Sequence, residues 1–558
     1  MSALEKEQID MSLTGGQAIV KSLEAFGIDT TYCLAGESFL PTIEALRDSG
    51  IRTITSRLEI ETGFAALAHG SLTNTPGVAL VTRGPGASNL SISIHTAQQS
   101  SIPLVALIGQ VPSTAMEYEA TQKIDYKEMF GSIAKGVFTP RTPQEMADFV
   151  MEALELSVSG RPGPVVVDMP IDILKQEADV NVPTPQVEEL LKPSEACIKV
   201  IIGLIKEAKH PVIIAGERLG FENATDELSA FAKKANAGVL TAMRQQDLIP
   251  FDHECHLGSL GLGQPPHVIK ALDEADLVIN LGHRMNQETT RLFDKNLLKG
   301  KKFVSIYPDK ETVEHPLYKA DVKSISHIKP TLEALINSDL ETGENSWVEG
   351  IHQEQINFMT SPEGVSKADV DMAEVVKVVN EVFPEDGIII TDAGNFATWP
   401  QVGYKFRSPH TQLGPINGAM GYAGPAALAA KIVHPNKKAL AFVGDGGFLM
   451  TGPAALATAI HEDLPIIMIV CDNSHYGTIF MHHARAGNKD NYTLGLTNPD
   501  FAALASSYEG VKSFTVNKTE EFEAALKEAL AHNGSSLLHL KTDISDIAAG
   551  KTLDQIQG

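Results

Sequence analysis

The sequence predicts an α/β protein made of three doubly wound parallel-sheet domains, of which the first and the last resemble each other. Three observations predict this fold class. Short runs rich in Val, Ile, Leu and Ala alternate with segments of helical period, which is the pattern of parallel strands covered on both faces. Two polar stretches, Gln176 to Ser194 and Asp339 to Glu349, divide the 558 residues into thirds of similar size. The first and last thirds also repeat the order strand, glycine turn, helix and proline-led strand.

The expected strands are the short apolar runs of each third. A chain of 558 residues is too long for one hydrophobic core, and the two polar stretches predict domains at residues 1–180, 190–340 and 360–558. Eight runs are expected to form buried strands: Val78 to Thr82, Leu104 to Ile108, Val165 to Asp168, Val212 to Ala215, Leu277 to Leu281, Ile388 to Thr391, Leu440 to Val443 and Ile466 to Val470.

The two outer thirds match in the turn that follows a buried strand. In the first, GVALVT runs into Gly84 and Gly86, and a helical segment leads to Pro103. In the last, ALAFV runs into Gly444 and its glycine neighbours, and a helical segment leads to Pro465. This pattern indicates two similar domains that flank a third, although the same strand, glycine turn and helix are common to unrelated α/β proteins.

Charge and composition exclude several classes of protein. The chain carries 45 Lys and Arg against 70 Asp and Glu, a formal net charge of −25, so its field repels phosphate backbones and anionic lipid surfaces. Its longest apolar runs are strand-sized, and the acidic start MSALEKEQIDMSL has no apolar core of a signal peptide. We therefore expect a cytoplasmic protein that binds neither nucleic acid nor membranes. Four widely spaced cysteines are typical of reduced thiols there: Cys33, Cys197, Cys255 and Cys471.

The segment from Lys438 to Gly477 is the most informative for chemistry. A buried strand ends in Gly-Asp-Gly-Gly around Asp445, and the next ends in Asp472-Asn473. Because parallel strands present their carboxyl ends at one edge, Asp445 and Asn473 are expected to converge. Both offer oxygen ligands that Mg²⁺ prefers, and the glycines and the following helix start favour a phosphate. The alternative is a structural glycine turn with Asp445 as a helix cap and a surface turn after it.

Two further glycine turns fall in the same third. TDAGNFATW, residues 391–399, is again a strand end followed by glycine. GPINGAMGYAGP, residues 414–425, spaces Gly418, Gly421 and Gly424 as a loop that a ligand can approach closely. Each pattern is common alone, but together they put three turns of the cofactor-binding type in one domain.

In the first third, SRLEIE places two carboxylates beside an apolar run and before a helix of small residues. If a strand continues here, alternation puts Glu59 and Glu61 on the same side. Otherwise one of them lies at the helix start, where it suits the helix dipole. The functional interpretation is that one of the two is buried with a raised pKa and shares a proton with a ligand nitrogen.

These motifs together resemble the thiamine-diphosphate-dependent enzymes. GDGG at 444–447 with Asn473, RLE at 57–59 and GPGASN at 84–89 occur in that family's order. The segments GESFLPTIEAL, IPLVALIGQVP, GAMGYAGPAA and NPDFAALA look most similar to acetolactate synthase catalytic subunits. The resemblance implies an N-terminal pyrimidine-binding domain, a Rossmann-like middle domain, and a C-terminal domain that binds diphosphate and Mg²⁺.

The resemblance also implies roles for individual residues. Glu59 would bond the pyrimidine ring nitrogen and favour the imino tautomer, which removes the thiazolium proton, and Gln122 would line the substrate pocket. Asp445, Asn473 and the backbone carbonyl of His475 would hold Mg²⁺. The other residues expected at the cofactor are Gly394, Asn395, Phe396, Gly418, Met420, Gly446, Gly447, Tyr476 and Gly477.

The sequence departs from the family's pattern at several positions. Arg83 stands before GPG where a small residue is usual, and Thr121 and Lys123 flank Gln122. The two cations favour an anionic substrate that carries a carboxylate; the alternative is that each is paired with a nearby acid. Pro453 lengthens a helix start by one residue and is expected in a first turn, where proline is tolerated.

Two more features bear on the lid and on a second cofactor. His482 and His483 follow YGTIF and would enter a lid over the substrate, either as proton shuttles or as solvent-facing residues. The turns at 216–218 and 282–284 are of the kind that binds FAD in acetolactate synthases, but GSLGLGQPPH and MNQETT replace the family's segments there. We therefore expect a structural middle domain without FAD, and FAD binding is the alternative.

The resulting hypothesis is a thiamine-diphosphate- and Mg²⁺-dependent carboligase that acts on a 2-keto acid such as pyruvate, expels CO₂ and joins the remaining fragment to a second carbonyl compound. The alternatives are a 2-keto acid decarboxylase, a lyase or an acyltransferase on the same scaffold, an FAD-containing oxidase, and a non-catalytic relative. Because the family's active site lies between two subunits, we expect a homodimer or homotetramer in which Glu59 of one chain serves the cofactor held by the other.

Overall fold

The computed structural model describes residues 11–186, 188–360, 366, 368–488, 490 and 492–557. The first ten residues, which hold most of the segment without signal-peptide features, lie outside these ranges. The chain divides into two compact units. One comprises the chain up to Glu188 with Leu428–Val433 and Thr451–Asp463, and the other comprises Glu189–Ala427, His434–Met450 and Leu464–Gly558.

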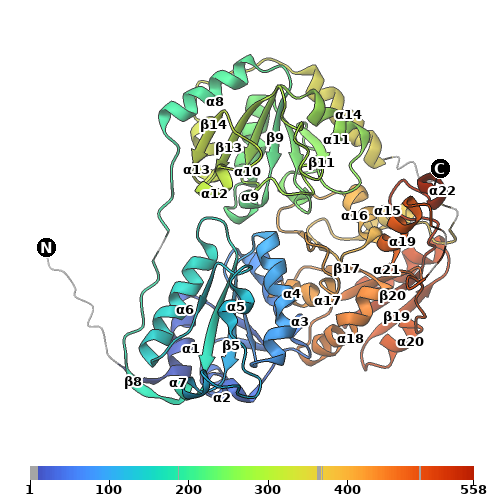
Figure 1. Cartoon of the computed structure of the whole chain (residues 1–558). Coiled ribbons are helices and arrows are strands. Elements are labelled where there is room, and N and C mark those ends of the chain that lie inside the picture. Colours follow the sequence, from blue (N-terminus) through green and yellow to red (C-terminus); the bar gives the residue numbers. More distant parts are fainter. Residues whose placement is uncertain are drawn as a thin grey trace. The chain divides into compact units, whose positions relative to one another are not determined.

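The N-terminal third, blue to cyan in Figure 1, contains a six-stranded parallel sheet whose strands follow the order β3-β2-β4-β5-β7-β6. Its central strands are fully buried aliphatic runs, as strands covered on both faces require. The strands are β2 (Thr30–Cys33), β3 (Arg52–Thr55), β4 (Gly77–Val81), β5 (Leu104–Gln110), β6 (Gly136–Phe138) and β7 (Pro164–Pro170). A separate antiparallel pair joins β1 (Met11–Thr14) to β8 (Glu177–Val180), so the predicted linker begins as a strand.

Helices cover both faces of this sheet. Two of them, α1 and α6, share a core with the sheet through side chains such as Val20, Val150 and Leu107. The small residues of α3 let it approach α4 closely, because a Cβ added at Gly63 would lie only 2.4 Å from the Cβ of Ser93. The helices are α1 (Gly15–Phe26), α2 (Leu40–Arg47), α3 (Glu59–Thr73), α4 (Pro85–Ser100), α5 (Tyr126–Phe130), α6 (Pro143–Val158) and α7 (Ile171–Lys175).

The middle third forms a second six-stranded parallel sheet in the order β11-β10-β9-β12-β13-β14. Counted along the domain this is 3-2-1-4-5-6, the order of dinucleotide-binding folds, so the Rossmann-like prediction is confirmed. The strands are β9 (Pro211–Ala215), β10 (Gly238–Thr241), β11 (His256–Ser259), β12 (Leu277–Leu281), β13 (Lys302–Tyr307) and β14 (Val322–Ile325). The helices are α8 (Glu195–Glu207), α9 (Glu217–Phe221), α10 (Thr225–Ala235), α11 (Pro266–Glu274), α12 (Lys310–Val313), α13 (Ile328–Ile336) and α14 (Ser346–Thr360).

The last third forms a third six-stranded parallel sheet in the order β16-β15-β17-β18-β20-β19. Counted along each domain, this order and that of the N-terminal sheet are both 2-1-3-4-6-5, so the predicted likeness of the outer thirds is confirmed. The strands are β15 (Ile388–Thr391), β16 (Gln412–Leu413), β17 (Ala439–Gly444), β18 (Ile467–Asp472), β19 (Lys512–Val516) and β20 (Ser536–Lys541). The helices are α15 (Met372–Val382), α16 (Thr398–Gly403), α17 (Ala423–Val433), α18 (Asp445–His461), α19 (Gly477–Arg485), α20 (Phe501–Ser506), α21 (Thr519–Ala531) and α22 (Leu553–Gln557).

All eight predicted strands are present in these sheets, but one local expectation is wrong. Pro453 lies in the interior of α18, which begins at Asp445, and not in a first turn. The helix starts directly at the strand end, so the added residue extends the helix and does not precede it. Proline at an interior position removes one helical hydrogen bond and crowds the preceding turn.

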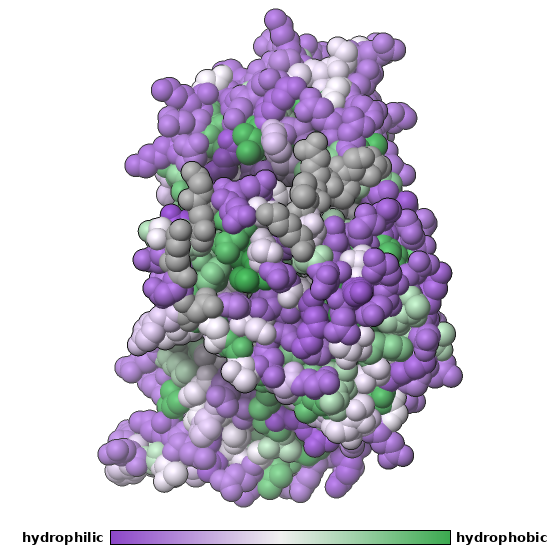
Figure 2. Space-filling view, turned by 90° about the vertical axis from the view of Figure 1, so that its right-hand side faces the viewer, coloured by the Kyte–Doolittle hydropathy of each residue, from purple (hydrophilic) through white to green (hydrophobic). Residues whose placement is uncertain are grey.

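The helices, the molecular surface and the unpaired cysteines agree with the expectations drawn from the composition. No helix of the described residues is long and apolar enough to cross a membrane. Hydrophilic residues predominate on the face shown in Figure 2, and apolar residues form small groups between them. The four cysteines are unpaired, three of them buried and Cys197 partly so, as predicted.

Candidate active site

The carboxyl ends of β17 and β18 form the centre of the candidate site. The two strands pair in register up to Gly444 and Cys471. Asp445, the first residue of α18, therefore lies beside Asp472, the last residue of β18, and Asn473 follows directly. The register of two neighbouring parallel strands thus brings the predicted metal-ligating residues to one sheet edge.

Asn498, which the sequence analysis did not single out, joins the two strand ends. Its Nδ2 atom donates to Asp445 Oδ2 at 2.7 Å and to Asp472 Oδ1 at 2.8 Å. Its Oδ1 atom is buried and has no partner among the described residues. The segment NPDFAALA, which carries Asn498, contributed to the family resemblance, but nothing in its local pattern indicates that the chain returns to the strand ends.

The pKa values of Asp445 and Asp472 are shifted in opposite directions. Burial raises the pKa of Asp445 to about 6. Burial also opposes ionisation of Asp472, but hydrogen bonds from His539 at 2.8 Å and Lys541 at 2.9 Å outweigh it and lower the pKa of Asp472 well below its usual range. Asp472 is thus neutralised by the protein, whereas Asp445 has no ion pair within the described part of the chain.

Asp392, which directly follows β15, holds two of the glycine turns next to each other by hydrogen bonds. Its carboxylate accepts hydrogen bonds from the backbone N–H groups of Ala393 at 2.8 Å, Gly421 at 2.8 Å and Tyr422 at 3.2 Å. It therefore fixes the loop that carries Gly418 and Met420 beside the turn that carries Gly394. Sequence reasoning missed this role, although Asp392 stands in the TDAG motif.

The turn after β15 is closed by its own side chains. A Cβ added at Gly394 would meet the Phe396 ring at 2.5 Å, and one added at Gly444 would meet it at 2.8 Å, so this ring packs across both glycines. Any contact of Phe396 with a ligand would therefore come from its backbone. Asn395 Oδ1 accepts a hydrogen bond from Thr478 Oγ1 at 2.9 Å, which links the turn to the start of α19.

The residues that precede α19 lie over the same edge. Tyr476 covers Gly446, where an added Cβ would meet the Tyr476 ring at 2.8 Å. The backbone N–H of His475 donates to Asn473 Oδ1 at 3.0 Å, and this holds the amide in a fixed orientation. Within α19, His482 is exposed and His483 is partly buried, so the roles proposed for the two histidines remain predictions.

These residues fit a divalent cation and a diphosphate. Asp445 offers a buried carboxylate without a protein counter-charge, Asn473 offers an amide oxygen, and the free Oδ1 of Asn498 beside them can accept from a metal-bound water. Gly418 has φ +75° and a Cβ built there would meet no atom within 4 Å, so this loop leaves open space beside its backbone. Such an oxygen set suits Mg²⁺, whereas the described residues contain no cluster of three His, Cys, Asp or Glu able to hold a metal.

In the N-terminal unit, both carboxylates of SRLEIE are buried at the start of α3. The helix begins at Glu59, so the strand does not continue through the motif. Glu59 Oε2 accepts a hydrogen bond from Asn89 Nδ2 at 2.9 Å. Glu61 Oε2 accepts from the backbone N–H of Arg57 at 2.7 Å, and burial raises the pKa of Glu61. Glu61 thus closes the turn that precedes the helix, and the role of Glu59 stays a prediction.

Gln122 and Arg83 lie around the Gly84 turn of the same unit. A Cβ at Gly84, where φ is +61°, would meet the backbone O of Gln122 at 2.7 Å, so Gln122 packs directly on this turn. Arg83 Nη2 pairs with Glu37 Oε1 at 2.6 Å. The alternative of pairing with a nearby acid thus holds for Arg83, while the role of Lys123 stays a prediction.

The middle domain does not fit the diphosphate of FAD at its switch point. The crevice between β9 and β12 is filled by Glu217 and His283, whose carboxylate and Nδ1 lie 2.7 Å apart. A Cβ at Gly216 would lie 2.3 Å from the His283 Cβ, so the two turns already touch. Burial opposes ionisation of Glu217, but His283 outweighs it and lowers its pKa. A diphosphate would meet an ionised carboxylate here.

Three parts of the chain match models of known protein families. The family described as thiamine pyrophosphate enzyme matches in three parts: the N-terminal TPP binding domain at residues 13–129, the central domain at 198–335 and the C-terminal TPP binding domain at 392–540. The central match spans all strands of the middle sheet, whereas the N-terminal match ends before β6 and β7 and the C-terminal match begins after β15. The chain belongs to the thiamine pyrophosphate enzyme family.

Curated relatives of the chain within this family include acetolactate synthase large subunits. The chain is 31% identical over 552 residues to a probable acetolactate synthase large subunit of Methanocaldococcus jannaschii, covering 95% of this chain and 92% of the relative. It is 30% identical to the acetolactate synthase large subunit of Corynebacterium glutamicum, with 93% and 84% covered. It is 28% identical to that of Lactococcus lactis, with 94% and 92% covered.

Proposed function

We propose that this protein is a thiamine-diphosphate- and Mg²⁺-dependent carboligase of the acetolactate synthase type, with a 2-keto acid such as pyruvate as its substrate. The observation that carries the proposal is the buried, uncompensated carboxylate of Asp445 beside Asn473, at the edge where the family's C-terminal domain binds its cofactor. The similarity to acetolactate synthase large subunits over nearly the whole chain supports the choice of reaction.

The C-terminal residues would anchor and neutralise the diphosphate end of the cofactor. Asp445, Asn473 and the backbone carbonyl of His475 would hold Mg²⁺. The loop at Gly418 would leave its backbone accessible to the cofactor, whereas Gly394 and Gly446 are covered by Phe396 and Tyr476. Asp472, already bonded to His539 and Lys541, would orient Asn498 and so keep Asp445 in place.

The N-terminal residues would control a proton at the other end of the cofactor. Thiamine diphosphate supplies the electron sink that allows a 2-keto acid to lose CO₂. Glu59 would share a proton with a ring nitrogen of the cofactor, and Asn89 would hold its carboxylate in position. Gln122, which rests on the Gly84 turn, would line the space for substrate.

We further propose that the active form is a homodimer or homotetramer in which Glu59 of one chain serves the cofactor held by its partner. Two apolar side chains at the start of α18, Leu449 and Met450, are 47% and 40% exposed close to Asp445 in the chain, which supports cover by a partner. Native mass spectrometry of the purified protein would test this: a stable monomer with full activity would contradict it.

The decisive experiment supplies thiamine diphosphate, Mg²⁺ and pyruvate, follows CO₂ release and identifies products by NMR. Acetolactate would support the carboligase, whereas acetaldehyde as the product would replace it by a decarboxylase. Omission of Mg²⁺ should abolish turnover. In the same assay, Glu59→Gln should lose turnover. Its matched control is Glu44→Gln, which changes an exposed glutamate of the same domain and should keep full activity.

A further inference from the structure

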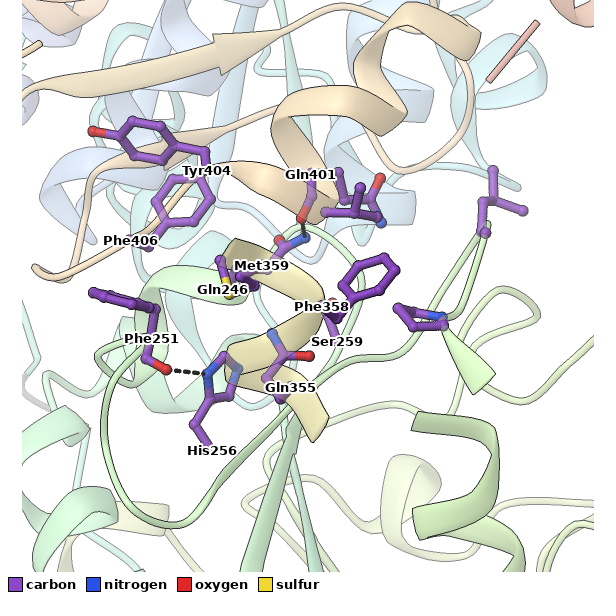
Figure 3. Close-up of a pocket in the computed structure, with 14 residues that line it drawn as sticks. Gln246, Phe251, His256, Ser259, Gln355, Phe358, Met359, Gln401, Tyr404 and Phe406 are labelled. Atoms are coloured by element: carbon purple, nitrogen blue, oxygen red, sulfur yellow. Dashed lines mark hydrogen bonds between the residues drawn. The ribbon is translucent and has the colours of Figure 1, made fainter. Parts of the chain in front are cut away.

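A cavity at the outer edge of the middle sheet is too small for a substrate or a cofactor. It lies beside the edge strand β11 and is bounded by α14 and α16 (Figure 3). Its free volume is only ≈ 30 Å³, which is room for about one or two water molecules. The buried polar group that bears further on the proposed reaction lies in the N-terminal unit, at the base of the loop that carries Gln122.

This loop, residues 111–125 between β5 and α5, holds Gln122 in a strained turn. The backbone N–H of Lys123 donates to the backbone oxygen of Ala120 at 3.0 Å, so Gln122 is the third residue of a four-residue turn. Its φ is +67°, a value that favours glycine at this position of a turn. A glutamine held in a conformation better suited to glycine indicates that the side chain has a use there.

The side chain of Gln110, the last residue of β5, closes the base of the loop. Gln110 is fully buried, and both ends of its amide are used. Its Oε1 accepts from the backbone N–H of Val111 at 2.9 Å, and its Nε2 donates to the backbone oxygen of Ile124 at 2.9 Å. The amide therefore joins the first residue of the loop to the residue that directly follows the strained turn.

Two other contacts hold the loop, but farther from its strained turn. The Tyr126 hydroxyl donates to the backbone oxygen of Gly109 at 2.8 Å, at the start of α5. Asp172 accepts from the backbone N–H of Ser113 at 2.8 Å and from the Ser113 hydroxyl, near the beginning of the loop. The bond from Gln110 to Ile124 thus lies closer along the chain to Gln122 than either of these contacts.

We propose, on the basis of the proposed function, that Gln110 is a positioning residue for the substrate: it fixes the turn 120–123 against Gly84 and so keeps Gln122 beside the space for the 2-keto acid. The contact with Gly84 is close, because a Cβ built there would lie 2.7 Å from the backbone oxygen of Gln122 and 2.8 Å from its Cβ. Since Gln110 is buried and its amide is bonded to the backbone at both ends, it acts through Gln122 and does not itself touch substrate.

The first test is Gln110→Met, which keeps the length of the side chain and removes both hydrogen bonds. In hydrogen–deuterium exchange on the full chain, the amides of residues 111–125 should exchange at least about fivefold faster than in the wild type. With thiamine diphosphate and Mg²⁺ supplied, the KM for pyruvate should rise about three- to tenfold, because a binding contact of Gln122 is weakened. The kcat and the affinity for thiamine diphosphate should stay within about twofold.

The second test is Gln110→Glu, which keeps the shape of the side chain and adds a proton that pH can remove. A protonated carboxyl group donates to Ile124 and accepts from Val111 as the amide does, whereas a carboxylate only accepts. Burial should raise the pKa of this acid as it raises that of the adjacent Asp168 to about 7, so the acid stays protonated at pH 6. Compared with the wild type at the same pH, loop exchange and KM should be nearly normal at pH 6 and should resemble those of Gln110→Met at pH 8.

Gln144→Met is the matched control. Gln144 makes the same pair of bonds in the same unit, since its Nε2 donates to the backbone oxygen of Asn181 and its Oε1 accepts from the Asn181 N–H, each at 2.8 Å. Its loss removes two comparable bonds away from the Gln122 loop. Loop exchange and KM should therefore stay within about twofold of the wild type.

Three results would overturn the proposal: unchanged exchange of residues 111–125 in Gln110→Met, faster exchange with unchanged KM, or equal behaviour of Gln110→Glu at pH 6 and pH 8. The pH comparison uses one protein under two conditions, so it decides the question even where Gln110→Met does not fold. Unchanged loop exchange counts against Gln110 whether or not pyruvate is consumed. A wild type that leaves pyruvate untouched, while Gln110→Met loosens the loop, counts against the proposed function alone, and KM is then measured with the 2-keto acid that is consumed.

Discussion

One buried arginine of the middle domain, Arg244, offers a sharp test of the contact between the middle and last sheets. It is 6% exposed, donates to the Thr391 hydroxyl, and reaches the backbone oxygen of Asp392 at 3.3 Å. Burial lowers the pKa of Arg244 to about 10, so the guanidinium is charged at neutral pH. Burial also raises the pKa of Asp392 to about 6. We predict that Arg244→Met lowers the free energy of unfolding by about 3 kcal/mol at pH 8.

The magnitude follows from the surroundings of Asp392. Two unit charges about 5 Å apart attract by about 3 kcal/mol at an effective dielectric constant of 20. The two hydrogen bonds of Arg244 add about 1 kcal/mol each, and relief from burying the guanidinium offsets part of this sum. The pKa of the Asp392 carboxyl lies above its unfolded value, so its ionised form is the unfavourable one in the fold. Without Arg244 this pKa rises further, so the loss of Arg244 costs most well above pH 6, and the cost declines as pH falls toward 6, below which the carboxyl is protonated in both proteins.

The assay is unfolding of the protein without cofactor, by heat and by urea, at pH 8 and pH 5. A loss of about 3 kcal/mol corresponds to a fall in the melting temperature of roughly 3–4 °C, because an unfolding entropy of about 2.1 cal/mol/K per residue applies to several hundred residues. The control is Arg291→Met, since Arg291 also has positive φ but pairs with Asp273 at the surface, and it should cost less than about 1 kcal/mol. The double variant Arg244→Met/Asp392→Asn should recover part of the loss at pH 8. Equal stability of Arg244→Met and the wild type at pH 8 would refute the reasoning.

Three further outcomes are expected. Glu59→Gln should lower turnover by about 10²–10⁴-fold while thiamine diphosphate still binds, and unchanged turnover in steady-state kinetics would remove Glu59 from the reaction. Asp445→Asn should raise the Mg²⁺ concentration needed for half-maximal cofactor binding by at least about tenfold in fluorescence titrations; no change would place the metal elsewhere. His69, buried against the Tyr32 hydroxyl at 3.1 Å, has its pKa lowered to about 4 by burial, so the folded state takes up a proton later than the unfolded chain as pH falls. Burial of His69 should therefore lower the free energy of unfolding by about 3 kcal/mol as the pH falls from 6.5 to 4. His69→Phe should flatten this loss in urea unfolding measured over that range.

Hydrophobic periodicity and the placement of glycines were sufficient to predict the strands of the three sheets and the positions of the main turns. The run Leu277 to Leu281 is a strand over the same residues in the structure, and apart from Asn280 it is aliphatic, as is typical of a strand covered on both faces. Asp445 is at a strand end for the same reason. The helix start at Glu59 and the interior position of Pro453 were not decided by local pattern, since both depend on where one element passes into the next.

The residues that the sequence analysis missed are those whose partners are distant in the chain. Asn498 joins Asp445 and Asp472, and Arg244 reaches Thr391 and Asp392 from another domain. Nothing in the local sequence of Asn498 or Arg244 indicates such contacts, because they depend on how loops fold back over the carboxyl edge of a sheet.

The sequence by itself determined the fold class, the likeness of the outer domains and the family, because these rest on the periods and motifs that short stretches of chain carry. Only the tertiary structure decided the state of each polar group: that Asp472 is neutralised by His539 and Lys541 while Asp445 is not, that Arg83 is paired with Glu37, and that Glu217 closes the switch-point crevice. The physical reason is that burial and the charge of neighbours set the state of an ionisable group, and those neighbours are brought together by the packing of distant segments.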